Sequence, residues 1–191
     1  GRLTPSRFEH SLAVADRAVE LARRWGADPA KARTAGLLHD ILKDAAPAAQ
    51  LQIFRDFGIL LDTVERQVQK LWHAKAGAVF IERILGVADP EILSAVRYHT
   101  TGHAGMDILE TVIYLADFTS SDRDYPDVDV LRRLSDEDLD QAMAYALSYT
   151  IRDLVQKKRA VHPDTLACYN EVILRLYPDE RLPEWEKSHL L

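Results

Sequence analysis

The sequence lacks the features that mark secreted and membrane-bound proteins. Among its 191 residues there is one cysteine, Cys168, so an internal disulfide is excluded and a reducing compartment is the simpler interpretation. No apolar run approaches the ~20 residues of a membrane span, and the first residues lack the apolar segment of a signal peptide. We therefore expect a cytoplasmic protein that does not contact a membrane.

Positive charge is also scarce. The 24 lysines and arginines are outnumbered by 30 acidic residues, which gives a formal net charge of -6 at pH 7. A general nucleic-acid-binding protein normally presents a basic surface, so nucleic acid is not an expected partner. A small anionic ligand in a local basic pocket is still compatible with this charge.

Three missing patterns narrow the fold and the chemistry. No segment of useful length alternates apolar and polar residues as a half-buried strand does. There is no glycine-rich phosphate loop of the Walker or dinucleotide-binding type and no serine nucleophile elbow, and Cys168 lies far in sequence from most of the histidines. What remains is an all-α protein without a recognisable serine or cysteine nucleophile.

Signals for helix ends support this fold class. Thr4-Pro5 is typical of a helix start, and Gly26 of its end. Asp28-Pro29 starts a second helix whose apolar residues continue through Leu42. The other expected helices are 47–57, a segment opened by a capping box of Asp62 and Glu65, one through 76–84, one from Asp89-Pro90 to His99, 106–118, a long one started by Ser135 with Asp138, and 163–177, with loops at 100–105 and 119–127.

We predict one helical domain over residues 1–177 and an irregular tail over 178–191. Because the first residue is Gly1, a further domain upstream is left open. The tyrosines and leucines after Ser135 form either core or an oligomer face; we favour core and leave a homodimer as a possibility.

The pair His39-Asp40 is the main candidate for chemistry, because it interrupts the apolar run Gly36 to Leu42. An unpaired buried carboxylate is costly, and its usual remedies are protonation, an ion pair or a metal. Bundle-like folds build metal sites from side chains on different helices. The further candidate ligands fall on other expected helices, and they are His10, His73, His99 and Asp117.

Four histidines and two carboxylates exceed the needs of one tetrahedral zinc. They suit two metals with a bridging carboxylate, in a nitrogen and oxygen environment that favours iron, manganese or a similar divalent ion. Each histidine taken alone is more often a cap, a surface residue or a hydrogen-bonded core residue, and His39-Asp40 alone is equally well a buried hydrogen-bonded pair. The complete set favours the metal site.

Basic residues near these ligands indicate the substrate class. Lys43 follows Asp40 by three residues, Arg97 precedes His99 by two, and Arg123 follows Asp117 in the next loop. Two metals with nearby cations suit phosphoryl transfer, in which the cations neutralise developing charge. His103 lies in a glycine-containing loop and is expected at the mouth of the site, as a substrate contact or proton donor, or else as an exposed loop residue.

The order of these residues and their local sequences resemble the HD-domain metal-dependent phosphohydrolases, and specifically their YqeK-like branch. The similar segments cover nearly the whole chain, and they are 37–44, 71–74, 95–102, 112–117, 163–165 and 169–170.

The resemblance implies an all-α, single-domain HD-type helical bundle with a dinuclear centre, most often iron. It implies symmetrical hydrolysis of diadenosine tetraphosphate to two ADP by a hydroxide held at that centre. His10, His39, Asp40 and Asp117 would hold one metal, and Asp40 would bridge to a second metal held by His73 and His99.

For the substrate, the resemblance points to Lys43, Arg97, Thr101 and Arg123 as phosphate-facing residues. We add His103 to the substrate contacts, and we take Asp40, Lys43 and His103 as the candidate catalytic residues. Two other interpretations stay open: another HD-type phosphohydrolase, such as a nucleotidase or a nucleoside triphosphate hydrolase, or a non-catalytic module that binds a nucleotide such as a nucleoside diphosphate.

Overall fold

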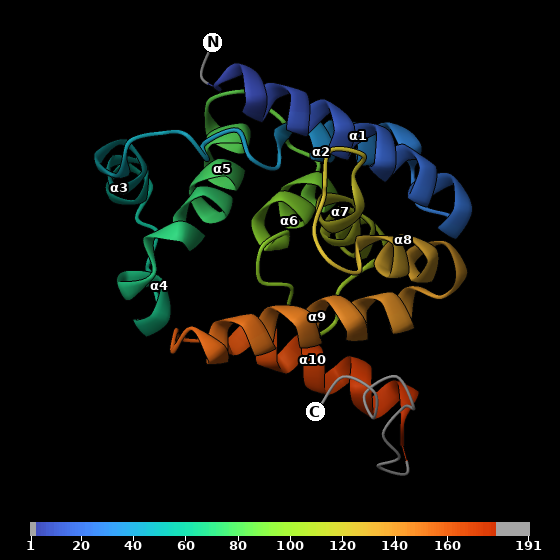
Figure 1. Cartoon of the computed structure of the whole chain (residues 1–191). Helices are drawn as coiled ribbons and strands as arrows, with labels where there is room; N and C mark the ends of the chain where they lie inside the picture. Colours follow the sequence, from blue (N-terminus) through green and yellow to red (C-terminus); the bar gives the residue numbers. More distant parts are fainter. Residues whose placement is uncertain (1–2, 179–191) are drawn as a thin grey trace.

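A computed structural model describes residues 3–178, and within this range the chain forms ten α-helices and one 3-10 turn, with no strand (Figure 1). The all-α class is confirmed. The predicted irregular tail lies outside the described residues except for Pro178. No described helix combines the length and apolar character that a membrane crossing requires. The elements are α1 (Pro5–Trp25), α2 (Pro29–Leu38), α3 (Pro47–Asp56), α4 (Thr63–Gln67), η1 (Gln69–Leu71), α5 (Trp72–Arg83), α6 (Pro90–Tyr98), α7 (Ile108–Thr119), α8 (Val128–Glu137), α9 (Leu139–Gln156) and α10 (Pro163–Leu176).

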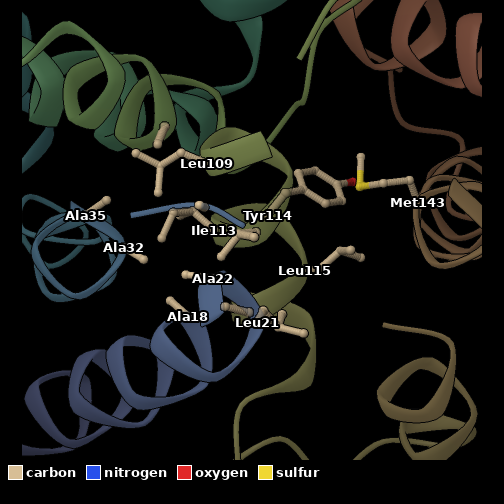
Figure 2. Packing of buried hydrophobic residues seen from close by; sticks show 14 of the residues in the cluster. Ala18, Leu21, Ala22, Ala32, Ala35, Leu109, Ile113, Tyr114, Leu115 and Met143 are labelled. Atoms are coloured by element: carbon tan, nitrogen blue, oxygen red, sulfur yellow. The ribbon is translucent and has the colours of Figure 1, made fainter. Parts of the chain in front are cut away.

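Helix α7 is the centre of the fold. It packs against α1, α2, α6, α8 and α9, and its residues 112–116 are completely buried. In Figure 2, Leu109 and Ile113 face alanines of α1 and α2, while the ring of Tyr114 points toward Met143 of α9. Because α7 is enclosed on all sides, Asp117 near its end is held at the edge of the core.

Helices α1 and α2 approach each other closely because small residues line their contact. A Cβ atom added at Gly36 would lie only 2.7 Å from the Cα atom of Ala15. Ala18, Ala22 and Ala35 at the same contact are fully buried. This close packing brings the end of α2 beside the first half of α1.

A second, smaller core holds α3 against α5. Its buried members are Leu42, Phe54, Ala76 and Phe80. Figure 1 shows α3 and α4 lying to one side of the main bundle, next to the first half of α5. This cluster fixes the start of α5, where His73 lies.

Four of the predicted helix starts are confirmed in detail. The side chains of Thr4, Asp28 and Asp89 cap α1, α2 and α6, and Asp62 with Glu65 forms the expected capping box of α4. Capping of this kind satisfies amide groups that have no partner within the helix.

The predicted extent of the second helix is wrong, since α2 ends at Leu38 and turns follow it. The His39 ring offers a physical reason. Its Nδ1 atom lies 2.7 Å from the Gly36 carbonyl oxygen, the acceptor that a continuing helix would offer to residue 40. Beyond this point the amides of Ile41 and Lys43 bond three residues back, in a tighter turn.

The predicted start of the long helix is also displaced. Residues 128–137 form a separate helix, α8, and Ser135 lies inside it with its hydroxyl on the Leu131 carbonyl. Helix α9 starts after Asp138, whose carboxylate caps it. Leu147 of α9 is buried, as expected for core, whereas Tyr149 is 39% exposed, so the prediction of core is wrong for this tyrosine.

Candidate metal centre

All six predicted ligands meet in one place. His10 comes from α1, His39 and His99 follow the last residues of α2 and α6, His73 is the second residue of α5, and Asp117 follows the buried residues 112–116 of α7. Asp40 lies in the middle. Each histidine approaches a carboxylate of the set: His10 Nε2 lies 3.0 Å from Asp117 Oδ1, His73 Nε2 3.1 Å and His99 Nε2 3.4 Å from Asp40 Oδ1, and His39 Nε2 3.6 Å from Asp40 Oδ2.

Three of the histidines share one local arrangement. The Nδ1 atoms of His39, His73 and His99 each lie 2.7–2.8 Å from the carbonyl oxygen three residues earlier, at Gly36, Lys70 and Val96. A carbonyl only accepts hydrogen bonds, so each Nδ1 must donate. In the neutral ring the proton is then on Nδ1, and Nε2 presents a lone pair to the centre.

Two of these lone pairs face a donor, the Lys43 ammonium at His73 and the Thr100 hydroxyl at His99, and the third, on His39, faces none among the described residues. The Nε2 atoms of His73 and His99 are 3.2 Å apart, and both face Asp40 Oδ1. His39 Nε2 and Asp40 Oδ1 are buried without a hydrogen-bond partner among the described residues. A proton or a cation is required to stabilise such a cluster.

The pKa values favour the cation. Burial lowers the pKa of His39 to about 4 and that of His73 to about 4, so neither ring holds a second proton near pH 7. Asp40 is ionised although it is buried, because the Arg7 guanidinium donates to its Oδ2 atom at 2.8 Å and Lys43 Nζ lies 3.5 Å from its Oδ1 atom. Imidazole nitrogens with carboxylate oxygens suit a divalent transition metal. The residues therefore fit the metal predicted from the sequence.

The ligand atoms form two overlapping groups. In one, atoms of His10, His39 and Asp117 lie within 4.8 Å of one another, and in the other the same holds for His39, Asp40 and His99. His73 joins the second group through Asp40. Because the two oxygens of Asp40 face different partners, this carboxylate is suited to a position between two ions.

His10 is oriented by a residue that sequence reasoning missed. Its Nδ1 atom lies 2.7 Å from a carboxylate oxygen of Asp122, in the loop after α7. Burial would lower the pKa of His10, but the adjacent Asp117 and Asp122 raise it above the ordinary value. Carboxylates behind a ligating histidine fix its ring and strengthen it as a ligand.

Three cations neutralise the carboxylates of the centre. The Arg7 guanidinium donates to Asp40 Oδ2 at 2.8 Å, Lys43 Nζ lies 3.5 Å from Asp40 Oδ1, and the Arg123 guanidinium pairs with Asp117. Lys43 and Arg123 were predicted near the site. Arg7 was not, although its position three residues before His10 on α1 is a helical spacing that places both on one face.

No hydrogen bond or ion pair joins Thr101 or Arg97 to a candidate ligand within residues 3–178. The hydroxyl of Thr100, which the sequence did not single out, is 3.1 Å from His99 Nε2, whereas the Thr101 carbonyl accepts a hydrogen bond from Thr165. The Arg97 guanidinium lies over the ring of Tyr98.

His103 contacts the loop and α7. Its Nδ1 atom bonds the Ala104 carbonyl and its Nε2 atom lies 2.9 Å from Glu110, while its ring lies against Tyr98. Glu110 also accepts hydrogen bonds from Ser94 and from the Asp107 amide. These contacts hold the loop between α6 and α7, and a role of His103 at the substrate stays a prediction.

The family follows from comparison with known proteins. The HD domain family model matches residues 7–122, a range that contains all six candidate ligands. The chain is 39% identical to the symmetrical bis(5'-nucleosyl)-tetraphosphatase of Bacillus subtilis, over 90% of this chain and 92% of that protein. It is 34% identical to the protein of the same name from Halalkalibacterium halodurans, over 90% of this chain and 91% of that protein. A crystal structure of a predicted HD superfamily hydrolase involved in NAD metabolism from Clostridium acetobutylicum matches with a TM-score of 0.88 and 35% identity, covering 91% of this chain and 92% of that one. The chain belongs to the HD domain family.

Proposed function

We propose that this chain hydrolyses dinucleoside polyphosphates and cleaves diadenosine tetraphosphate symmetrically into two ADP. The observation that carries the proposal is the buried cluster of lone pairs around Asp40, flanked by Lys43 and Arg123. Relatives that match nearly the whole chain are named for this activity. In the reaction one water adds across the central P–O–P bridge: its hydroxyl bonds to one phosphorus, and the other phosphate leaves with the bridging oxygen.

We assign the ligands as two sets that share Asp40. His10, His39, Asp40 and Asp117 would hold one ion, and Asp40, His73 and His99 the other. We propose iron, with manganese or another divalent metal as the alternative. When bound, such a metal pair can lower the pKa of a water from ~15.7 toward ~7 and polarise a phosphate oxygen.

The cations of the chain bind the phosphates in this proposal. Lys43 lies on the His73 side of the centre, 3.1 Å from its Nε2 atom, and Arg123 lies on the opposite side, 3.4 Å from His10 Nε2. With Asp40 and Asp117 engaged as metal ligands, Lys43 and Arg123 would be free to turn to phosphate oxygens. Groups on either side of the scissile bridge would then stabilise the charge that develops there.

A neighbouring cavity suits a nucleoside. It has a volume of about 520 Å³ and is lined by apolar groups of Leu71 and Leu154 together with Thr100 and Thr101. Thr100 connects it to the centre, because its hydroxyl is 3.1 Å from His99. Pockets of this size and apolar character are typical of small-molecule sites. We infer that one base of the substrate lies in this cavity, with Thr101 among its contacts. We further propose that the enzyme is cytoplasmic. Its assembly as a homodimer stays a prediction.

Metal analysis combined with product chromatography tests the proposal. Purified protein supplied with iron or manganese should convert diadenosine tetraphosphate to ADP as the sole nucleotide product. Asp40→Ala should lose both bound metal and activity, while Asp124→Ala, an exposed carboxylate in the α7–α8 loop, should keep both. Phosphate or triphosphate released from mononucleotides, with the dinucleotide left intact, would instead identify a nucleotidase or a nucleoside triphosphate hydrolase. Nucleotide binding without hydrolysis under any of these metals would identify a binding module.

A further inference from the structure

We propose that a second nucleoside subsite lies between α8 and α9, on the Arg123 side of the metal centre. The inference rests on the proposed function, since a symmetrically cleaved dinucleotide carries a nucleoside on each side of the reacting bridge. The structure has a cavity of about 500 Å³ at this place, lined by Tyr145, Tyr149 and Arg152 of α9, Arg133 of α8, and Pro126 and Asp127 before α8. Its volume is within the range of small-molecule sites.

The cavity is tied to the metal centre by one short loop. Arg123, which pairs with Asp117, is three residues from Pro126, a separation of at most about 11 Å along the chain. Between them, the hydroxyl of Tyr125 donates to the Phe118 carbonyl, next to Asp117, and its ring lies 5.6 Å from that of Tyr149. The loop between α7 and α8 therefore contacts both the cavity, through Tyr125 and Pro126, and the His10–Asp117 half of the centre, through Arg123.

The lining has the chemistry of a nucleotide site. Tyr145 and Tyr149 are four residues apart on one face of α9, and aromatic rings are the surfaces on which bases stack. Within residues 3–178, Arg133 and Arg152 form no salt bridge, whereas the nearby acids are engaged: Asp153 pairs with Lys157 at 2.6 Å and Asp127 interacts with Tyr145. Two guanidinium groups are left to bind phosphate or stack on a base.

The two cavities match the two halves of the centre. The cavity at Thr100 adjoins His73 and His99, while the cavity at Tyr149 adjoins the loop that supports His10 and Asp117. Helix α9 contributes to both, through Thr150 and Leu154 to the first and through Tyr145 and Tyr149 to the second. A substrate with its central bridge at the metals would thus find a nucleoside subsite in each direction.

Substrate discrimination tests the proposal. Hydrolysis of diadenosine tetraphosphate is compared with that of adenosine 5'-tetraphosphate, which has the same phosphate chain and a single nucleoside. Loss of one base-stacking ring corresponds to about ten-fold in affinity. Tyr149→Ala should therefore lower the ratio of the two kcat/KM values, dinucleotide over mononucleotide, by about ten-fold, mainly through KM. Tyr149→Phe keeps the ring and should keep the ratio, as should Val155→Ala, an exposed position on α9 outside the cavity.

A binding measurement gives an answer that does not depend on turnover. Equilibrium dialysis of metal-loaded protein against ADP should show two molecules bound per chain, and in Tyr149→Ala one of the two should bind about ten-fold more weakly. An unchanged kcat/KM ratio in Tyr149→Ala, or a single ADP per wild-type chain, would overturn the second subsite while leaving the hydrolase intact. A wild-type protein that releases no ADP from the dinucleotide would instead overturn the proposed function.

Discussion

At the scale of single residues, the position of one proton on each imidazole decides what the centre can bind. The carbonyls of Gly36, Lys70 and Val96 hold that proton on Nδ1 and turn three Nε2 lone pairs inward. Since burial keeps the second proton off His39 and His73, the metal-free centre brings Nε2 lone pairs and carboxylates together with fewer donors than acceptors, and His39 Nε2 has no partner among the described residues. Its dependence on pH follows from the same proton positions.

Protein treated with a chelator should become less stable as pH falls from 7 to 5. His39 and His73 have a pKa of about 4 in the folded chain, against ~6.5 for an unfolded histidine. Between these values the unfolded chain binds more protons, so acid favours unfolding. His10, whose pKa is raised, acts in the opposite direction and offsets part of the loss. Urea unfolding at the two pH values measures the effect, and equal stability at both would contradict the assignment.

Asp122 should control metal affinity through His10. Asp122→Ala removes the acceptor 2.7 Å from His10 Nδ1, and loss of such a supporting carboxylate typically costs about 10–100-fold in metal affinity. Competition with a coloured chelator measures the change. Asp124→Ala, two residues away in the same loop, is the matched control and should bind metal as the wild type does. Equal affinity in both variants would show that His10 needs no partner.

The six candidate ligands that meet at the centre were predictable from sequence, but their supporting residues were not. His39, Asp40 and Asp117 stand out because they interrupt apolar helical patterns. Asp122 contacts His10, which lies 112 positions earlier in the chain, and Arg7 contacts Asp40, which lies 33 positions later. A single sequence does not reveal contacts between residues so far apart. Thr100 and Thr101 are neighbours of the same type, and only the backbone conformation after α6 decides which hydroxyl faces His99.

At the scale of helices, ligand positions depend on where elements end and how closely they pack. His39 and His99 both follow the last residue of a helix and bond the carbonyl three residues back. The loop after α7 is held by Arg132, whose guanidinium donates to the carbonyls of Ser120 and Arg123 at 2.9 and 2.8 Å. Helix ends and a clamped loop, more than helix interiors, therefore present the reactive groups.

Gly36→Ala should destabilise the protein, whereas Gly77→Ala should not. The added methyl at Gly36 would meet the Ala15 backbone at 2.7 Å and force α1 and α2 apart, and overpacking of this kind costs about 1–3 kcal/mol. At Gly77 the methyl would meet Ile41 and Val96 at 3.7 and 3.8 Å, an ordinary contact, and helix propensity adds up to about 1 kcal/mol. Urea unfolding compares them, and the reverse ranking would refute the close contact of α1 with α2.

Most helices could be located from their capping residues, and the two errors have local causes. Helix α2 stops early because the His39 ring takes a backbone acceptor, which an apolar pattern does not indicate. Helix α8 starts after Asp127 in a left-handed conformation without a side-chain cap, so the usual start signal is missing. The first error falls at the candidate metal centre, where the His39 ring overrides the helical pattern, and the second falls at the left-handed Asp127 before α8.

At the scale of the whole molecule, the centre links elements that are otherwise held mainly by the core. Its ligands come from α1, the ends of α2 and α6, the start of α5, and α7, and so span residues 10–117. The small core of α3 and α5 shares Ile41 with the main core, to which α5 also contributes Ala78 and Ile81. A metal held jointly by both parts would therefore oppose their separation and stabilise the fold as a unit.

Metal should accordingly raise the melting temperature of the whole protein. At a metal concentration about 1,000 times Kd, the stabilisation is about 4 kcal/mol, which for a chain of this length corresponds to roughly 8–16 °C. Iron(II) or manganese(II) should give this shift in a thermal melt under anaerobic conditions. Magnesium, which prefers oxygen ligands, should give a much smaller shift because four of the six ligands are imidazoles.

Asp40→Ala should melt at one temperature with or without metal, since it lacks the carboxylate shared by both ligand sets. An equal shift in Asp40→Ala, or an equal shift with magnesium, would mean that the ion binds elsewhere.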